Sequence, residues 1–579
     1  MKFLPRSIPH DTVTALQEQG LAAFWAQLYA ARGIGSAAEL DYALSRLLPP
    51  ASLKGADTAA QWLAEALEQG QRVCVVADYD CDGATACTLA LKGLEMLGAE
   101  AGQIDYLVPN RIQDGYGLTP SIAQRVHDSG AQVLLTVDNG IASVDGVRHA
   151  RALGLTVLIT DHHLPADELP DAHAIVNPNQ PGCPFASKNL AGVGVMFYVL
   201  LALRSLLRER GIFTAQTQPR LDALLPLVAL GTVADVVPLD ANNRLLVAQG
   251  LERIRAGRLP VGMLALFETS QRTWAKASTQ DLAFGLAPRL NAAGRLTDMT
   301  IGIECLRTDD ASRAQELAAM LDDINRKRRE LESDMRIQAQ AIAERLCADT
   351  GAHHTQPPAA ISVFDEGFHE GVVGIVASRL KDQFHRPAFV FAPSAAAPDI
   401  GTLKGSGRSI AGFHLRDALD LLAKRHPQVL EKFGGHAMAA GCSIRQEHFA
   451  LFQQAMAEIA REWLHASDLQ GMLLTDGALP AQARTLEHAQ AIGRCVWGQG
   501  FAAPLFSEEL EVLDQRILAG KHSALKLLHH GQMVDAIWFG HNSPLPRTAH
   551  LAYRLEVNEW QQRKQLRFVI EGCEAPAAC

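Results

Sequence analysis

Short apolar runs alternate with helix-like segments through much of the first half of the chain. Strands are expected at residues 73–78, 104–108, 133–138 and 156–161, and helices at 84–97, 119–129 and 143–153. Strands that alternate with helices in this way form a parallel sheet joined by right-handed crossovers. The pattern therefore predicts an α/β domain with a doubly wound parallel sheet.

The segments on either side of this sheet carry helix periodicity. Residues 1 to about 70 are expected to form helical packing structure without chemistry of their own. Their expected apolar face consists of Leu40, Leu44, Leu47 and Leu48. Residues 309–347 repeat apolar positions near heptad spacing without Gly or Pro, which predicts a connecting helix on the order of 60 Å long.

Two further units are expected after the connecting helix. A strand at 361–364 opens a smaller α/β unit, and from about residue 470 short β-like runs alternate with Gly or Asn turns, which fits a five-stranded barrel of the OB type. The barrel strands are expected at 510–513, 524–528, 534–539 and 553–557. The predicted divisions are an N-terminal helical segment 1–50, the sheet domain 51–305, the connecting helix 306–350, the smaller α/β domain 355–462 and the barrel 468–579.

Composition is typical of a globular protein with several cores. A chain of 579 residues, 48% hydrophobic and 20% charged, is too long for one core. The formal net charge of −10 argues against a generally basic nucleic-acid coat, so any nucleic-acid contact needs a local positive groove. Ten cysteines without a C-x-x-C pair favour reduced thiols, and there is neither a signal-type leader nor an apolar run of membrane length. We therefore expect a cytoplasmic protein.

Three carboxylates at alternate positions, Asp78, Asp80 and Asp82, follow the first strand. Alternate residues of an extended chain point the same way, and three like charges repel unless a cation lies between them. The stretch imitates an EF-hand loop, but its twelfth position is Leu89 where a bidentate Glu is required. A covalent aspartyl phosphotransferase is the rival interpretation at this point.

Further ligand-type residues follow the later strands. Asp138 ends the third strand, Asp161, His162 and His163 end the fourth, and Asp235 lies in an apolar run farther along. The carboxyl ends of parallel strands share one rim, so these side chains are expected to meet the acidic loop. The number of ligands exceeds what one ion requires, which favours two ions and disfavours the covalent rival.

These motifs match, in order and spacing, those of a known superfamily. The stretches 78–83, 137–140, 161–163 and 233–238 resemble the four motifs of the DHH phosphoesterases. The stretches 108–117, 190–194 and 287–295 extend the resemblance to the single-stranded-DNA-specific 5′→3′ exonucleases of that superfamily, and 433–441 resembles the Gly-Gly-His signature of a DHHA1 domain. The resemblance covers about residue 50 to the C-terminus. It also implies an OB domain at the end of the chain.

The resemblance implies a site for two ions, Mn²⁺ or Mg²⁺. The expected inner ligands are Asp80, Asp82, Asp138, His162 and Asp235. Asp78 and Asp161 are expected to ligate or to orient the ligands, and His163 to lie on the phosphoryl oxygen, so these three complete the predicted catalytic set.

Substrate contacts are implied in two regions. Arg111, Arg289, Asn291 and Arg295, with His163, are expected to line the path of the DNA strand, and Arg379, Ser406 and Arg408 to hold its terminal 5′-phosphate. His436 is expected to contribute to substrate binding. The Gly-rich stretches 368–380 and 404–409 suit anion binding, although Gly-Ser-Gly more often marks a turn.

The expected function is hydrolysis of single-stranded DNA from the 5′ end to mononucleotides, in DNA repair and recombination. The expected protein is a monomer that works with a helicase and a single-strand-binding protein. Two alternatives stay open: a DHH hydrolase of small nucleotides or pyrophosphate, and an inactive scaffold that holds single strands. Aromatic residues of the barrel could stack on bases, although aromatics at this spacing are usually core. They are Trp497, Phe501, Phe506, Trp538 and Trp560.

Overall fold

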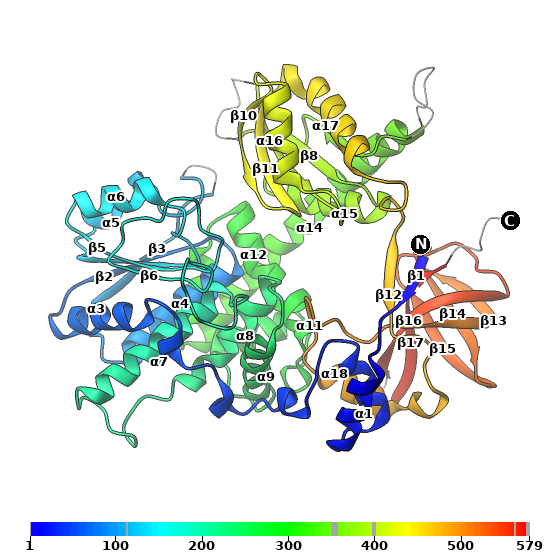
Figure 1. The fold of residues 1–579 in the computed structure, drawn as a ribbon, viewed down its shortest axis with the longest axis horizontal. Coiled ribbons are helices and arrows are strands. Elements are labelled where there is room, and N and C mark those ends of the chain that lie inside the picture. Colours follow the sequence, from blue (N-terminus) through cyan, green and yellow to red (C-terminus); the bar gives the residue numbers. More distant parts are fainter. Residues whose placement is uncertain (1, 112–113, 349–356, 396–400, 561–562, 575–579) are drawn as a thin grey trace. The chain divides into compact units, whose positions relative to one another are not determined.

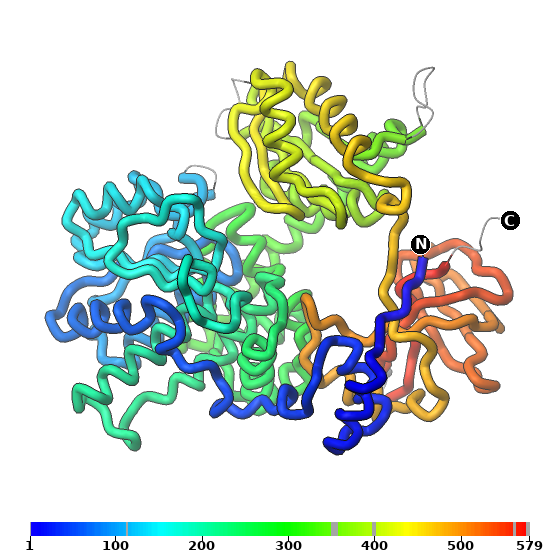
Figure 2. Tube along the Cα trace, in the orientation of Figure 1, coloured from blue at the N-terminus to red at the C-terminus, as the bar shows by residue number. Residues whose placement is uncertain are grey.

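The computed structural model describes residues 2–111, 114–348, 357–395, 401–560 and 563–574. It divides into two compact units. The first contains Met1–Lys2 and Asp323–Leu473, and the second contains Phe3–Asp322 and Leu474–Cys579. Figure 2 shows that the second unit is assembled from the blue-to-green and the orange-to-red parts of the trace, which are distant in sequence.

The second unit contains the predicted parallel sheet. Its strands are β2 (Val73–Ala77), β3 (Ile104–Leu107), β4 (Val133–Val137), β5 (Thr156–Thr160) and β6 (Ala174–Val176). They pair in the order β3-β2-β4-β5-β6, and every pair is parallel. The four strands predicted from sequence are confirmed, and β6 is an additional edge strand that the prediction missed. Strands β2 and β4 are buried along their whole length, which is why they are continuous apolar runs.

Helices cover both faces of this sheet (Figure 1). Val73 and Val75 share a core with α3 (Ala56–Glu68), α4 (Cys81–Met96) and α7 (Gly192–Glu209). Val76 and Leu134 point to the opposite face and pack with α5 (Pro120–Asp128) and α6 (Val144–Ala152). The prediction of a doubly wound sheet is confirmed.

The N-terminal segment contains β1 (Lys2–Pro5), α1 (His10–Glu18) and α2 (Ala23–Ala30). The prediction of a helix with Leu40, Leu44, Leu47 and Leu48 on its apolar face is wrong. Two short 3₁₀ turns, Ala37–Leu40 and Leu44–Arg46, occupy this stretch, and the leucines pack against the core as partly buried residues. Pro49 and Pro50 follow at once, and a residue before proline avoids the helical conformation.

Further helices complete the second unit. They are α8 (Leu225–Ala234), α9 (Ala241–Arg255), α10 (Val261–Thr269), α11 (Thr279–Asp281), α12 (Ala287–Leu296) and α13 (Thr300–Arg307), with a π-helical turn at Leu282–Leu286. The predicted long connecting helix is confirmed as α14 (Ala311–Ala348), and the division between the two units falls inside it. No helix of the described residues combines the length and apolarity that crossing a bilayer requires.

The first unit contains a five-stranded sheet in the order β10-β11-β9-β8-β7. Its strands are β7 (Ile361–Phe364), β8 (Ala388–Pro393), β9 (Thr402–Arg408), β10 (Leu430–Gly435) and β11 (Ala439–Arg445), and its helices are α15 (Val373–Phe384), α16 (Leu415–Arg425) and α17 (Phe449–Trp463). The Gly-rich stretch that could mark a turn is strand β9. A Cβ atom on Gly405 would lie 2.3 Å from the Phe391 ring and one on Gly407 2.5 Å from the Phe389 ring, so these glycines make room for buried phenylalanines.

The predicted five-stranded barrel is confirmed as a closed sheet in the order β13-β14-β15-β17-β16. Its strands are β13 (Phe506–Leu518), β14 (His522–His529), β15 (Gln532–Trp538), β16 (Thr548–Trp560) and β17 (Arg563–Cys573); β12 (Met472–Thr475) and α18 (Leu486–Arg494) precede it. The prediction missed β17.

Of the five barrel-region aromatics, three are buried in the core: Trp497, Phe501 and Phe506. These three aromatic residues therefore belong to the core, as is usual for aromatics at this spacing, and are not exposed for stacking on bases. Trp538 is partly buried and stacks on His541 with ring centroids 3.7 Å apart. The side chain of Trp560 lies outside the described part of the structure.

Candidate metal centre

The acidic loop between β2 and α4 turns sharply and directs its carboxylates to one side. Asp80 is the N-cap of α4, and its Oδ1 atom accepts a hydrogen bond of 3.0 Å from the Gly83 N–H. The Asp78 Oδ1 atom accepts a hydrogen bond of 2.7 Å from the Tyr79 N–H. A Cβ atom on Gly83 would lie 2.4 Å from the Asp78 carbonyl oxygen, so the turn requires glycine at this position.

The third carboxylate of the loop is bound by the start of another helix. Asp82 is buried, and its two oxygens accept hydrogen bonds from the Gly192 N–H (2.6 Å) and the Val193 N–H (3.0 Å) at the N-terminus of α7. The free N–H groups of a helix start favour an anion there. Asp82 therefore anchors the start of α7, and a carboxylate oxygen of Asp82 lies within 4.8 Å of ligand atoms of His162 and Asp235.

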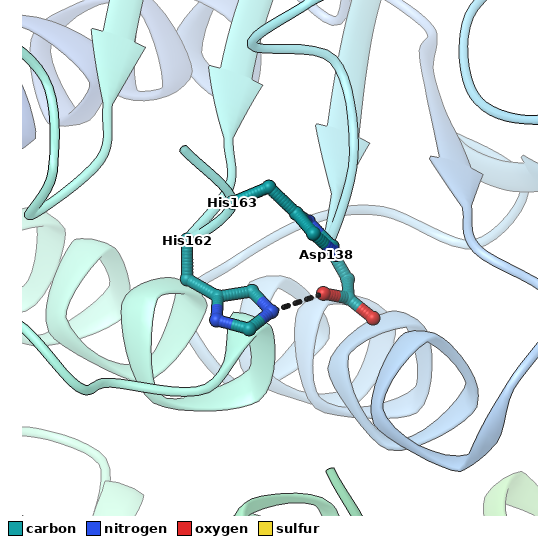
Figure 3. Close-up of side chains that lie close together, drawn as sticks. All are labelled: Asp138, His162 and His163. Carbon is teal, nitrogen blue, oxygen red and sulfur yellow. Dashed lines mark ion pairs between the residues drawn. The ribbon is translucent and has the colours of Figure 1, made fainter. Parts of the chain in front are cut away.

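Three residues from separate elements meet beside this loop. Asp138 follows β4 with a positive φ of 63°, His162 follows β5, and Asp235 is the C-cap of α8. The His162 Nε2 atom lies 3.1 Å from the Asp138 Oδ1 atom and 3.4 Å from the Asp235 Oδ2 atom. Figure 3 shows the His162 ring directed at Asp138. The residue after Asp235, Val236, also has a positive φ, of 61°, which is an unfavourable conformation for a β-branched side chain.

The protonation of His162 determines what the short His162–Asp138 distance means. Burial, and then the charge of His163, lower the pKa of His162 to about 4, so its imidazole is neutral near pH 7. A hydrogen bond to the Leu190 backbone involves the same ring. Neither the His162 Nε2 atom nor the Asp138 Oδ1 atom has a hydrogen-bond partner among the described residues. Two buried ligand-type atoms this close together, without a hydrogen bond between them, fit a cation that both would bind.

The other carboxylates support the same interpretation. Burial, and then neighbouring aspartates, raise the pKa values of Asp78, Asp138 and Asp235 well above the usual range, and raise that of Asp82 to about 7. Ligand atoms within 4.8 Å of one another form two sets with no member in common, one of Asp82, His162 and Asp235 and one of Asp78, Asp80 and Asp138. Carboxylate oxygens with one imidazole nitrogen suit Mn²⁺ and Mg²⁺, so these residues fit two divalent ions.

Asp161 and His163 form a separate pair next to these sets. The Asp161 Oδ1 atom accepts from the His162 N–H (2.7 Å), the His163 N–H (3.1 Å) and the His163 Nδ1 atom (2.8 Å), and its Oδ2 atom accepts from the Ile141 N–H (2.9 Å). Burial would lower the pKa of His163, but the bond to Asp161 outweighs it and raises the pKa to about 9. His163 is therefore a cation near neutral pH, and Asp161 shapes the loop that carries both histidines.

Comparison with known proteins identifies the family. Residues 72–232 match the DHH family N-terminal domain, 356–462 the DHHA1 domain, and 475–572 the RecJ OB domain. The chain is 46% identical over 558 residues, 95% of each protein, to the single-stranded-DNA-specific exonuclease RecJ of Haemophilus influenzae.

The chain belongs to the RecJ family. The resemblance inferred from the motifs is confirmed.

Solved structures of this family share the fold of the chain. RecJ of Thermus thermophilus in complex with Mn²⁺ superimposes with a TM-score of 0.82 at 29% identity, over 100% of this chain and 80% of that one. The complex of the same protein with Mg²⁺ gives a TM-score of 0.75 at 28% identity, over 100% and 78%. The α/β, DHHA1 and barrel architecture is therefore that of RecJ.

Of the residues predicted to line the DNA path, two lie near the acidic loop with exposed or partly exposed side chains. The Arg111 guanidinium lies 5.1 Å above the Tyr79 ring. Arg295, in the last turn of α12, is close enough to Tyr79 to lower the pKa of its hydroxyl, a smaller effect than the burial that raises it. Tyr116, which the prediction left without a role, packs edge-to-face on Tyr79, and its hydroxyl lies 3.3 Å from the His163 ring.

The other two predicted path residues are engaged with the protein itself. The Asn291 Oδ1 atom accepts a hydrogen bond of 2.8 Å from the Cys81 N–H, so Asn291 supports the acidic loop. Arg289 is buried, and its Nη2 atom lies 2.7 Å from the Asp322 Oδ1 atom on α14. Of these two residues, only Asn291 contacts the acidic loop, while Arg289 links α12 to α14.

The predicted phosphate-binding residues belong to the first unit. The Arg408 Nη1 atom donates to the Ser406 Oγ atom at 3.0 Å, and a Cβ atom on Gly374 would lie 2.8 Å from Arg408 Nη2. Ser406 and Arg408 on β9 therefore face the start of α15. Arg379 is largely exposed on α15 and lies 3.4 Å from Glu332, and His436 is in the turn between β10 and β11, where its N–H donates to the Ala439 carbonyl.

Two asparagines missed by the prediction contact the backbone of the histidine pair. The Asn177 Nδ2 atom donates to the His163 carbonyl at 2.9 Å, and the Asn179 Nδ2 atom to the His162 carbonyl at 2.7 Å. Both follow strand β6 at alternate positions, the same signal that identified Asp78 and Asp80. They were missed because β6 itself, only three residues long, was missed.

A second group of ligand-type residues lies in the barrel, where Glu508, His529 and His530 approach one another within 4.8 Å. The Arg484 Nη1 atom, a donor, lies 3.3 Å from the His529 Nδ1 atom. The His529 Nε2 atom lies 3.4 Å from the Glu508 Oε1 atom. The Arg484 guanidinium places a cationic donor against this barrel network, which makes it less suited to a metal ion than the acidic cluster.

Proposed function

We propose that this chain is a metal-dependent exonuclease that degrades single-stranded DNA from the 5′ end to mononucleotides. The proposal rests on His162 Nε2 and Asp138 Oδ1, two buried atoms 3.1 Å apart that have no hydrogen-bond partner among the described residues and lie in a cluster with four further aspartates. Full-length similarity to single-stranded-DNA-specific exonucleases supplies the substrate class.

Two divalent ions, Mn²⁺ or Mg²⁺, complete the proposed site. The residues that would hold them are Asp80, Asp82, Asp138, His162 and Asp235, with Asp78 beside them. When bound, such ions activate water as the nucleophile and offset the negative charge that develops on the phosphate. The structures of the Thermus relative with Mn²⁺ and with Mg²⁺ support either metal.

The site also contains residues outside the proposed metal-ligand set that act on the substrate or position a group that does. His163 is held as a cation by Asp161, so it can donate a hydrogen bond to a non-bridging phosphoryl oxygen and stabilise the transition state. Tyr116 limits the rotation of that ring from the other side. Asp161 acts through His163 and through the backbone of the loop, which makes it a positioning residue.

The proposed DNA contacts divide between the two units. In the second unit, Arg111 and Arg295 contact the strand, while Asn291 acts through the acidic loop and Arg289 through α14. In the first unit, Arg379, Ser406 and Arg408 hold the 5′-phosphate and His436 assists them. Holding a chain end makes a phosphodiesterase an exonuclease, because it fixes which bond reaches the reactive groups.

The cellular setting that we propose is DNA repair and recombination in the cytoplasm. A monomer would take single strands from a helicase and compete for them with a single-strand-binding protein.

The test compares a long 5′-labelled single strand, the same sequence as duplex, and a dinucleotide, with and without Mn²⁺. We expect mononucleotide release from the long single strand only when Mn²⁺ is present, and none with Asp138→Asn, a substitution that preserves shape and tolerates a positive φ. Asp138 is preferred to Asp82 because Asp82 also binds the start of α7. Turnover of the dinucleotide alone would indicate a small-substrate hydrolase, and binding without cleavage would indicate a scaffold.

A further inference from the structure

The turn after β6 holds the loop that carries the two histidines. Asn177 and Asn179 flank Pro178, and their amide groups donate to the carbonyls of two consecutive residues, His163 and His162. Asn177 is completely buried, so its hydrogen bond has no competition from solvent. One short turn therefore binds both backbone carbonyls of the histidine pair.

The orientation of the Asn177 amide is fixed by the turn itself. Its Oδ1 atom accepts a hydrogen bond of 2.7 Å from the Asn179 N–H, which leaves the Nδ2 group directed at the His163 carbonyl. Pro178 between them restricts the backbone further. On the other side of the histidine loop, the Asp161 N–H donates to the Val176 carbonyl at 3.1 Å, so β6 and its turn hold the loop from end to end.

We propose that Asn177 and Asn179 are positioning residues that set the His162 imidazole for metal binding. The inference rests on the proposed two-metal function. His162 Nε2 faces Asp138 and Asp235 at 3.1 and 3.4 Å, so a small shift of its backbone would displace it from the ligand set. Groups that orient metal ligands without touching the metal typically change metal affinity about 10–100-fold when they are removed.

Gln180 supplies a matched control in the same turn. Its Nε2 atom also donates to two backbone carbonyls, those of Lys54 and Ile175, and its side chain is also buried, but neither hydrogen bond goes to the histidine loop. Gln180→Ala therefore removes buried amide hydrogen bonds of the same kind without releasing His162. A general loss of stability would affect all three variants alike.

The experiment measures Mn²⁺ binding directly, by calorimetry or by the electron paramagnetic resonance signal of free Mn²⁺, on the full chain without DNA. We expect Asn177→Ala and Asn179→Ala to weaken binding about 10-fold or more, and Gln180→Ala to change it less than about twofold. The Mn²⁺ concentration for half-maximal cleavage should rise in the same order, while cleavage at saturating Mn²⁺ largely recovers. If Asn177→Ala does not fold, the less buried Asn179→Ala carries the test.

Two results would overturn the inference: Mn²⁺ affinity like that of the wild type in folded asparagine variants, or an equal loss in Gln180→Ala. Failure of the wild-type chain itself to bind Mn²⁺ or to cleave single strands would instead contradict the proposed function, so the two failures are distinguishable.

Discussion

Arg289 on α12 places its guanidinium Nη2 atom 2.7 Å from the carboxylate of Asp322 on α14. The arginine side chain is 11% exposed and the aspartate side chain 25% exposed, so water screens the pair little. The same arginine donates to the Gly285 carbonyl, which adds a second anchor. This contact joins the last turns of the sheet domain to the beginning of the long helix within one unit.

Removing this arginine should destabilise the second unit. Arg289→Met leaves the Asp322 carboxylate without its cation, and we expect a loss of about 2–4 kcal/mol, seen as a melting temperature lower by several degrees. The matched control is Arg326→Met, since the Arg326–Asp323 pair on the same helix is exposed and should change stability by less than about 0.5 kcal/mol. Equal melting temperatures for the two variants would show that the buried pair does not anchor α14.

Gly294 should be required at its position, because α12 packs closely against the acidic loop there. A Cβ atom at Gly294 would lie 1.7 Å from the Tyr79 carbonyl oxygen, so Gly294→Ala must push the loop or α12 aside. We expect lower stability and loss of most Mn²⁺-dependent cleavage. Gly493→Ala is the control, because nothing lies within 4 Å of its added Cβ in α18, and there alanine should be neutral or stabilising. Normal cleavage by Gly294→Ala would mean that the loop tolerates displacement.

The barrel network should make stability depend on pH through Glu508. Burial would raise the pKa of this carboxyl, but hydrogen bonds from His529, Tyr553 and the Leu479 N–H outweigh it and lower the pKa below 4.5. A depressed folded-state pKa means that the stabilisation is fully present above the unfolded-state pKa, and is lost as the pH falls through the folded-state value. The stability difference between wild type and Glu508→Gln should therefore shrink as the pH falls below about 4.5. Thermal melts on both sides of this pH measure it, and a difference independent of pH would contradict the assignment.

The residues on β9 should confer a preference for a 5′-phosphate. Arg408 and Ser406 lie together at the start of α15, an arrangement that suits a phosphate. We expect Arg408→Gln to reduce the preference for 5′-phosphorylated over 5′-hydroxyl single strands about 10-fold or more. Arg425→Gln removes an exposed cation of the same unit that pairs with Glu462, and should leave the preference unchanged. The ratio of kcat/KM values for the two substrates is the measurement, and an unchanged ratio in Arg408→Gln would reject the proposed phosphate site.

The parts of the fold that the sequence predicted are those controlled by local pattern. Strands β2 and β4 are apolar runs buried on both faces, and α14 is a long repeat without Gly or Pro, so one-dimensional patterns were sufficient. Strand β6 has only three residues, too few for any periodicity. The stretch at Gly405 and Gly407 resembled a turn because its glycines serve phenylalanines on a neighbouring strand, which local pattern does not reveal.

The candidate site was predictable from the sequence where it depends on the topology of the sheet, but not where it depends on long-range contacts. Asp78, Asp138 and His162 end strands of one parallel sheet, so their convergence followed from topology. The partner of Arg289 lies on another helix, and the contacts of Asn177 and Asn179 run to main-chain carbonyls. Contacts between residues far apart in the sequence, and hydrogen bonds from side chains to main-chain carbonyls, produce no regular spacing of residues in the sequence. Both kinds of contact could therefore be found only from the structure.

We propose that residues of the acidic loop and residues at the ends of β4, β5 and α8 share one site around two divalent cations. Crystals grown with Mn²⁺ and measured at the manganese absorption edge test it most directly, since anomalous scattering locates each ion. We expect two peaks about 3.5–4 Å apart, one of them within ligand distance of His162 Nε2 and both bordered by Asp138 or its neighbouring aspartates. A map without a peak at His162 and Asp138, at Mn²⁺ concentrations that support cleavage, would contradict it.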